Sequence, residues 1–420
     1  FGSSQRLQEL STLMAMLRNL CILGQFLLAV SKFETWSLVL LEDALKNQGA
    51  ACLDGSPAGY FIEKGWGSGV DKWMIHWLGG GWCLDLEDCL ARSKTSLGST
   101  RNYSQEAQKE NILTFGDGGV GGYLSNRSEV NPDFYNWNKV FAIYCDGGSR
   151  NSEVEGAVAV GNESIFFRGH RILQATMESI METMKQSSGL HSVTDFIVGG
   201  CSAGGLTVIL HLDYIRSLLP HSVRVVGLPQ CGMFMDQPNY KGQPVYSPHY
   251  ASIFNLMGMA NSPSLHKGCI ETYSSEPWKC FMAQYVLPFI KTPFFVVNSF
   301  YDSWQFHEML QLPDECSYQQ KCTHAETGSQ HNMRDFIVMN LSAAANGQSY
   351  FLYSCVTHCQ FLNHDDGFQT LLVSDSNLRS AISNWYFRDI QFHGASILEE
   401  PNENPTCWSE IVQGQDTLHV

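Results

Sequence analysis

The stretch Gly200-Cys201-Ser202-Ala203-Gly204 decides the fold of this chain. It follows the stretch Asp195-Phe-Ile-Val198, which predicts a buried strand, and it precedes helical apolar spacing at 206–219. Only small side chains fit in so tight a strand-to-helix turn, which presents its serine at a helix N-terminus. We therefore expect Ser202 to be a nucleophile. A tight turn with a buried, unreactive serine is the alternative.

Composition and charge limit the classes of function. The chain has 420 residues, 44% of them hydrophobic, which suffices for one large core or two smaller ones. The sequence contains no internal repeat of 20–50 residues, so we set aside a repeat architecture. The net charge of -15 argues against nucleic acid and anionic membrane surfaces as partners.

Cysteines and glycosylation sequons indicate an oxidising compartment. There are 14 cysteines, and no Cys-x-x-Cys pair that would suggest a zinc ribbon. Three close spacings predict short disulfide loops: Cys83 with Cys89, Cys269 with Cys280, and Cys316 with Cys322. Four sequons begin at Asn102, Asn126, Asn162 and Asn340. Together these features predict the secretory pathway.

Residues 1–31 are expected to be an N-terminal extension that contains a signal peptide. Arg18 precedes an apolar run, and small residues follow near Ala29 to Ser31, where we expect cleavage. The apolar run is short for a membrane span, and no later segment reaches spanning length. We therefore expect a secreted protein with no stable membrane insertion after signal cleavage. An uncleaved signal anchor is the alternative.

Apolar strands alternate with helical stretches along the rest of the chain. Strands are expected at 73–78, 139–145, 195–198, 223–228, 294–300 and 350–355, and helices at 166–185, 206–219 and 377–388. This alternation predicts a doubly wound, mostly parallel sheet, and with the serine turn it predicts an α/β-hydrolase fold. We expect one domain over 50–395, with an irregular, cap-like insertion at 237–290. The tail at 396–420 is polar, and we expect it to be loosely held apart from Cys407.

The acid of a hydrolase triad follows the nucleophile along the chain and stands at a strand end. Asp302 comes two residues after the apolar strand 294–300, so we favour it over Asp236. An aspartate at this place can also cap a helix.

The histidine is expected after the next strand. His358 follows the strand 350–355 closely, and we favour it over His364, which stands among aspartates. In the triad scheme Ser202 attacks an ester carbonyl, His358 takes its proton, and Asp302 orients the imidazole. This chemistry requires no metal and no organic cofactor.

The tetrahedral oxyanion of such a reaction needs backbone N–H donors. Ala203 follows the nucleophile and is expected to give one donor. Gly80 and Gly81, at the end of the strand 73–78, are expected to give the others. Trp82 comes next, and we expect its indole to wall the acyl pocket.

These stretches together resemble the pectin acetylesterase/Notum family of secreted α/β-hydrolases. The resemblance covers most of residues 50–360. It rests on the motifs at 52–60, 79–83, 131–138, 144–147, 200–205, 301–304 and 358–360. It implies the nucleophile, acid and base at Ser202, Asp302 and His358, and the oxyanion loop at Gly80 and Gly81. It also implies the disulfides Cys52–Cys145, Cys83–Cys89, Cys269–Cys280 and Cys355–Cys407.

Two activities compete within this family. Plant and bacterial members remove acetyl groups from pectin, whereas Notum removes palmitoleate from Wnt proteins with a deep apolar pocket. The Gly-Gly-Gly-Trp-Cys and His-Cys-Gln motifs of this chain resemble the plant members. Leu78 departs from the glutamate usual in both branches. The acidic net charge also fits an anionic pectin poorly, unless the acidic residues lie away from the binding groove.

We favour an acetylated polysaccharide as the substrate and expect a monomer. The alternatives are a lipid deacylase, a catalytically inactive secreted binding protein and a serine peptidase. A peptidase remains open because the same triad cleaves amides.

Overall fold

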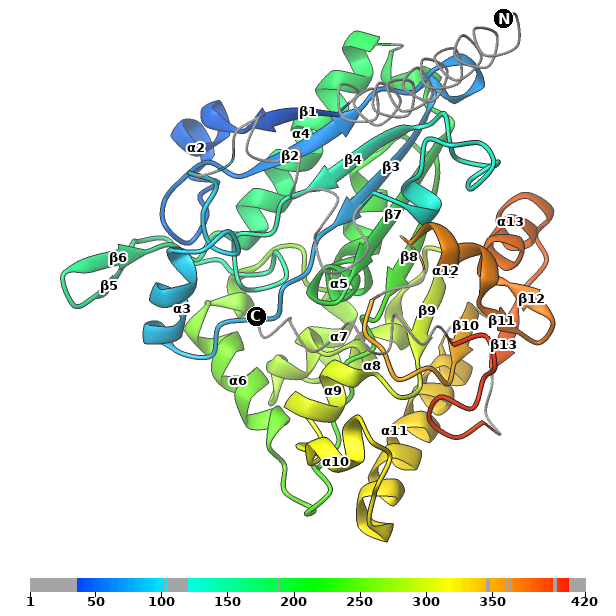
Figure 1. Cartoon of the computed structure of the whole chain (residues 1–420). Coiled ribbons are helices and arrows are strands. Elements are labelled where there is room, and N and C mark those ends of the chain that lie inside the picture. The colour runs from blue at the N-terminus through cyan, green and yellow to red at the C-terminus, as the bar shows by residue number, and fades with distance from the viewer. Residues whose placement is uncertain are drawn as a thin grey trace, which may run out of the picture.

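A nine-stranded sheet forms the centre of the part of the chain that the structure describes (Figure 1). The computed structural model describes residues 36–101, 103, 120–187, 189–344, 348–359, 362, 364–395 and 399–407. In sheet order the strands are β1 (Trp36–Leu40), β2 (Gly59–Glu63), β4 (Asn138–Ala142), β3 (Lys72–Trp77), β7 (Asp195–Cys201), β8 (Arg224–Gln230), β9 (Phe295–Ser299), β10 (Ser349–Tyr353) and β13 (His393–Ala395). β1 pairs antiparallel with β2, and β2 with β4, while the other neighbours are parallel. The mostly parallel α/β sheet is therefore confirmed.

Helices surround this sheet. They are α2 (Glu42–Gln48), α3 (Leu86–Ser93), α4 (Gly169–Ser187), α5 (Ala203–Leu218), α6 (Tyr246–Leu256), α7 (Lys267–Thr272), α8 (Ala283–Val286), α9 (Ser303–Glu308), α10 (Asp314–Ser317), α11 (His324–Ala343), α12 (Asp365–Thr370) and α13 (Leu378–Arg388). Two hairpins are β5 (Val158–Val160) with β6 (Glu163–Ile165), and β11 (Leu372–Val373) with β12 (Ser376–Asn377). The helix α5 is the most enclosed, with eleven of its sixteen residues buried. A helix that is apolar on most sides is stable only when other elements cover it, and the centre of the fold meets that need.

The sheet begins earlier than the expected domain boundary at residue 50. Residues 36–40 form β1, which pairs along its whole length with β2. The helix α11 was not predicted either, because its sequence is largely polar and lacks a continuous apolar stripe. It begins with a capping box, in which Thr323 and Glu326 bond each other's backbone N–H groups. That Thr-x-x-Glu pattern was the available signal.

Residues 237–290 are helical rather than irregular. They form α6, α7 and α8 with intervening 3₁₀ turns, and the disulfide Cys269–Cys280 closes part of the segment. In Figure 1 the helices α6 to α10 gather in the lower half of the view, away from β1 and β2. Asp236, the alternative acid, accepts a hydrogen bond from the Tyr285 hydroxyl at 2.6 Å. Its backbone N–H donates to Gln284 at 2.7 Å, so Asp236 fixes the beginning of this segment to its end.

The described part of the C-terminal tail is held more firmly than expected. Cys407 is joined to Cys355. The backbone N–H of Asn402 donates to the carbonyl of Ser354, and its side chain accepts from the N–H of Val356. Residues 399–407 therefore brace the loop that follows β10.

The expected signal peptide at residues 1–31 lies outside the described residues. Among the helices that the structure does describe, none combines the length and the apolar character that crossing a membrane requires. All four disulfides that the resemblance implied are present, and so is Cys316–Cys322.

A buried ion pair joins the antiparallel edge of the sheet to its parallel part. Glu63 of β2 and Lys139 of β4 are register partners. Lys139 Nζ lies 3.2 Å from Glu63 Oε2, and the two side chains are 0% and 1% exposed. The ammonium also donates to the Tyr135 carbonyl, while the other Glu63 oxygen accepts from Asn126. Burial lowers the pKa of Lys139 from its ordinary value. Removing one partner would strand a charge in the core.

We expect Lys139→Met to lower the free energy of unfolding by about 3–5 kcal/mol, because Glu63 is left buried without its cation. Replacing both residues, with Glu63→Leu and Lys139→Met, should cost much less, since no charge then remains. Urea unfolding of the three proteins measures both quantities. A single substitution that costs under about 1 kcal/mol would contradict this view of the pair.

Candidate active site

Ser202 stands at the turn between β7 and α5 in a backbone conformation rare for an L-residue. Its φ and ψ are 58° and -126°. Such conformations cost about 1–3 kcal/mol and persist only where the surroundings enforce them. A Cβ on Gly204 would lie 1.9 Å from the Trp77 carbonyl oxygen, and one on Gly200 would lie 2.4 Å from the Gly204 oxygen. The small residues around Ser202 are therefore required by backbone packing.

Asp302 and His358 are brought together by the neighbouring strands β9 and β10. Nδ1 of His358 lies 2.8 Å from Oδ2 of Asp302, which is fully buried. The other carboxylate oxygen accepts from the backbone N–H of Gln305, so Asp302 caps α9 and contacts the His358 ring at the same time. Within the described residues, Nε2 of His358 is buried and has no hydrogen-bond partner. This nitrogen is the one a triad histidine uses to accept a proton.

A disulfide that the sequence analysis missed connects the serine turn to the histidine loop. Cys201 immediately precedes Ser202, Cys359 immediately follows His358, and the two cysteines are bonded. Their Cα atoms are 5.9 Å apart. The available signal was positional: residues adjacent to two side chains that must meet are themselves within disulfide reach. No hydrogen bond joins Ser202 Oγ to His358 among the described residues, and this contact is often long in unliganded hydrolases.

Cys231 is the free cysteine of the described chain, and it lies beside this disulfide. Its sulfur accepts a hydrogen bond from the backbone N–H of Cys359 at 3.0 Å. Burial raises the pKa of the Cys231 thiol. The sulfurs of Cys231 and Cys359 and a nitrogen of His358 lie within 4.8 Å of one another. Cys359 is committed to its disulfide and offers no thiolate, so this group is a poor metal site.

The glycine loop after β3 passes directly over the serine turn. β3 and β7 are neighbours, with Trp77 in register with Gly200. A Cβ on Gly79 would lie 2.7 Å from Cβ of Ser202 and 3.0 Å from the backbone nitrogen of Ala203. Gly80 and Gly81 follow with φ values of 146° and 64°, which favour glycine.

Three N–H groups of this region are the donors that the sequence analysis expects for an oxyanion. Among the described residues, none accepts a hydrogen bond from the N–H of Gly80, Gly81 or Ala203. Ala203 is the first residue of α5, where unpaired N–H groups and the helix dipole favour an anion.

Trp82 belongs to a group of aromatic rings next to His358. It is 5% exposed, and its ring centroid lies 4.9 Å from that of Phe234, 5.2 Å from Tyr250 and 5.7 Å from Trp304. Phe234 and Trp304 in turn lie 6.3 Å and 6.1 Å from the His358 ring. The rings therefore form one packed aromatic group that reaches the edge of the candidate site.

Two methionines of the inserted segment lie against the loop after β4. Met257 and Met259 are both fully buried. A Cβ on Gly148 would lie 2.8 Å from the sulfur of Met257 and 3.3 Å from Cε of Met259. Met257 and Met259 therefore pack against Gly148 in the loop after β4.

Two other histidines are structural. Burial lowers the pKa of His76 and of His211 to about 3. Nδ1 of His76 lies 2.6 Å from the Tyr123 hydroxyl, and Nε2 of His211 lies 3.2 Å from the Ser149 carbonyl. Both rings stay neutral at physiological pH and keep these bonds.

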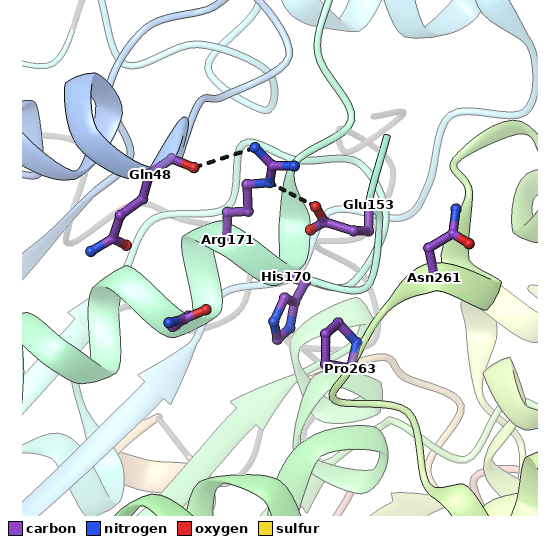
Figure 2. Close-up of a pocket in the computed structure, with 7 residues that line it drawn as sticks. Gln48, Glu153, His170, Arg171, Asn261 and Pro263 are labelled. Carbon is purple, nitrogen blue, oxygen red and sulfur yellow. Dashed lines mark hydrogen bonds and ion pairs between the residues drawn. The ribbon is translucent and has the colours of Figure 1, made fainter. Parts of the chain in front are cut away.

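A separate polar cavity of about 320 Å³ opens between α2, α4 and the segment near Asn261 (Figure 2). It is lined by Gln48, Glu153, His170, Arg171, Gln174, Asn261 and Pro263. Figure 2 shows Arg171 between the Gln48 carbonyl and Glu153, at 3.4 Å and 2.7 Å. Burial lowers the pKa of His170. None of the candidate catalytic residues lines this cavity.

Comparison with known proteins gives one consistent answer. The model of the family described as Pectinacetylesterase matches residues 30–408. Pectin acetylesterase 7 of Arabidopsis thaliana is 34% identical over 376 residues, which is 86% of this chain and 90% of that protein. Pectin acetylesterase 11 of the same plant is also 34% identical, over 88% of this chain and 92% of its own length.

Notum proteins are more distant relatives. The palmitoleoyl-protein carboxylesterase NOTUM of Schmidtea mediterranea is 26% identical over 73% of this chain and 55% of its own length. The solved structure of the Wnt deacylase Notum from Drosophila superposes with a TM-score of 0.71. The match covers 89% of this chain and 100% of the solved chain at 24% sequence identity. The similarity shows that the two chains share the α/β-hydrolase fold.

We expect loss of the Cys201–Cys359 disulfide, through Cys201→Ala with Cys359→Ala, to reduce both stability and esterase activity. The bond closes a separation of 158 residues, and losing such a bond typically costs about 2–5 kcal/mol. The control is Cys316→Ala with Cys322→Ala, which opens a separation of only 6 residues. It should keep full activity in a p-nitrophenyl acetate assay. Equal activity in both double variants would show that the first disulfide has no part in the site.

Proposed function

Because this chain belongs to the pectinacetylesterase family, we propose that it is a secreted serine esterase that removes acetyl groups from pectin or a related polysaccharide. Family membership makes it a carboxylic ester hydrolase. The acetylated polysaccharide is the substrate class that the names of its plant relatives print. Six disulfides among the described residues fit an oxidising, extracellular compartment.

The observation that carries the mechanism is the 2.8 Å contact between His358 Nδ1 and Asp302, with His358 Nε2 left open. In this proposal Asp302 holds the imidazole in the tautomer that accepts a proton at Nε2. The Cys201–Cys359 bond supports it further, because it keeps the histidine loop beside the turn that bears Ser202.

The proposed reaction has two stages. Ser202 Oγ attacks the acetyl carbonyl while His358 takes its proton, and the tetrahedral intermediate places its oxyanion at the N–H groups of Gly80, Gly81 and Ala203. The intermediate collapses as His358 returns the proton to the departing sugar hydroxyl. Water then attacks the acetyl-serine with His358 as base, and acetate leaves.

The aromatic group around Trp82 supports a small acyl substituent. Trp82 packs edge to face against Phe234 and Trp304, at centroid separations of 4.9 and 5.7 Å, and in a tilted arrangement against Tyr250 at 5.2 Å. Phe234 and Trp304 also lie beside the His358 ring. Each buried CH₂ of a longer acyl chain would gain about 0.8 kcal/mol only where an apolar cleft exists to receive it. Trp82 also donates its indole N–H to Ser149, which holds the ring in place. A fatty acyl chain would have to displace rings that are already packed.

We expect Ser202→Ala to abolish hydrolysis of p-nitrophenyl acetate while the protein stays folded, since loss of a triad nucleophile costs about 10⁶-fold in kcat. His358→Ala should be comparably damaging. The matched control is His364→Ala, a histidine six residues further along the chain, which should be mild. Circular dichroism checks folding. The opposite ranking of the two histidines would assign the base to His364.

We expect kcat/KM to fall steeply along the series p-nitrophenyl acetate, butyrate, octanoate and palmitate, because a longer acyl chain would have to displace the packed rings around Trp82. Trp82→Ala should flatten the series by opening space. Higher kcat/KM for octanoate or palmitate in the unaltered protein would instead support a lipid deacylase, the activity printed in the names of the Notum relatives.

A further inference from the structure

Three carbonyl groups around the proposed oxyanion donors are each held by a side chain. Arg92 Nη1 donates to the Gly80 carbonyl at 2.6 Å, and the Tyr144 hydroxyl donates to the Gly81 carbonyl at 2.6 Å. Ser149 Oγ donates to the Ala203 carbonyl at 2.8 Å. The carbonyls of the glycine loop and of the helix start are thus restrained from outside the backbone.

Restraint of these carbonyls matters because the peptide planes next to glycine residues can flip easily. Gly80 and Gly81 both have positive φ, and a glycine samples positive and negative φ with similar ease. Because glycine has no side chain, no side-chain packing of Gly80 or Gly81 fixes the direction in which their N–H groups point. The orientation must therefore come from what the carbonyls bind.

The direction of the Gly80 carbonyl decides the direction of a proposed oxyanion donor. In a planar trans peptide, the C=O of one residue and the N–H of the next point in opposite directions. Holding the Gly80 oxygen against Arg92 therefore directs the Gly81 N–H away from Arg92. A guanidinium is a strong hydrogen-bond donor for this carbonyl, since it stays charged and its hydrogen bonds are charge-assisted.

The fold places Arg92 for this contact. It lies on α3, three residues after Cys89, so the two side chains share one face of the helix. Cys89 is bonded to Cys83, which directly follows the glycine loop and Trp82. The disulfide thus holds α3 against the loop whose carbonyls Arg92 binds. A second, longer bond joins Arg92 Nη2 to the Trp82 carbonyl at 3.4 Å. Among the described residues, no carboxylate pairs with Arg92.

We propose that Arg92 is a positioning residue for the oxyanion hole: it fixes the Gly80–Gly81 peptide so that the Gly81 N–H faces the reacting carbonyl. This inference rests on the proposed function and deepens it. Arg92 also polarises that peptide, which strengthens the Gly81 N–H as a donor. It acts through the loop and does not touch the substrate, so its contribution belongs to the transition state and not to substrate binding.

The test compares Arg92→Gln and Arg92→Lys with a matched control, Arg216→Gln. Arg216 makes the same kind of bond, from its guanidinium to the Leu219 and Pro220 carbonyls at 3.2 and 3.1 Å. It lies near the C-terminal end of α5, at about 1.5 Å per residue roughly 21 Å along the helix from Ser202. Hydrolysis of p-nitrophenyl acetate gives kcat and KM, and thermal unfolding reports folding. Phenylboronic acid, which forms a tetrahedral adduct with a reactive serine, probes the oxyanion hole directly.

We expect Arg92→Gln to lower kcat about 10- to 100-fold, somewhat less than the 10²- to 10³-fold that loss of a donor costs, with KM changed less than about threefold. Affinity for phenylboronic acid should fall by a similar factor. Arg92→Lys should lie between, since an ammonium keeps the positive charge but lacks the rigid planar fork with which the guanidinium binds the Gly80 and Trp82 carbonyls. Arg216→Gln should keep kcat within about twofold.

Two results would overturn the inference. One is a kcat for folded Arg92→Gln within twofold of the unaltered protein. The other is a rise in KM with unchanged kcat, which would make Arg92 a substrate-binding residue. If Arg92→Gln does not fold, the kcat and KM of Arg92→Lys decide in the same way. Failure of the proposed function is distinguishable, because then the unaltered protein is inactive or Ser202→Ala keeps its activity.

Discussion

Backbone packed against backbone at the end of β7 is the constraint on which the rest of the structure depends. Gly204 and Gly200 lie so close to the carbonyls of Trp77 and Gly204 that neither can carry a side chain. Gly205 has the same relation to the Gln230 carbonyl. Strands β3, β7 and β8 therefore meet the start of α5 without an intervening layer of side chains. That closeness puts the glycine loop over Ser202, and it makes α5 the buried axis of the fold.

The loops that carry the candidate site residues keep a defined geometry because other contacts hold them in place. The loops are long, but each is tied next to the group it carries. Asp302 caps the helix that follows it, Cys201–Cys359 joins the serine turn to the histidine loop, and residues 399–407 brace the segment between β10 and His358. Covalent and hydrogen-bonded ties do here what regular secondary structure does elsewhere.

Much of the fold and of the candidate site was accessible from sequence because its signals are local. The turn around Ser202, the strand before Asp302 and the strand before His358 each lie within a few residues of the group they position. What was missed depends on pairs distant in sequence or on polar surfaces. Cys201 and Cys359 meet only once the sheet is assembled, and the contact of Arg92 with the Gly80 carbonyl depends on a side-chain reach that no spacing reveals. The polar helix α11 lacked a hydrophobic stripe, so only its capping box could mark it.

The position of Cys231 has a consequence for the synthesis of the chain. Cys201 must wait for 158 further residues before its partner Cys359 is made, whereas Cys231 follows it by only thirty. Cys231 is made 128 residues before Cys359. At about 5–20 residues per second, the growing chain contains Cys201 and Cys231 for about 6 to 26 s before Cys359 is added. Thiol–disulfide exchange is the chemistry that corrects such a pairing, and in the folded protein Cys231 lies next to Cys359. The bond that holds the His358 loop beside Ser202 can therefore form only after residue 359 has been made, and any earlier pairing of Cys201 must first be exchanged.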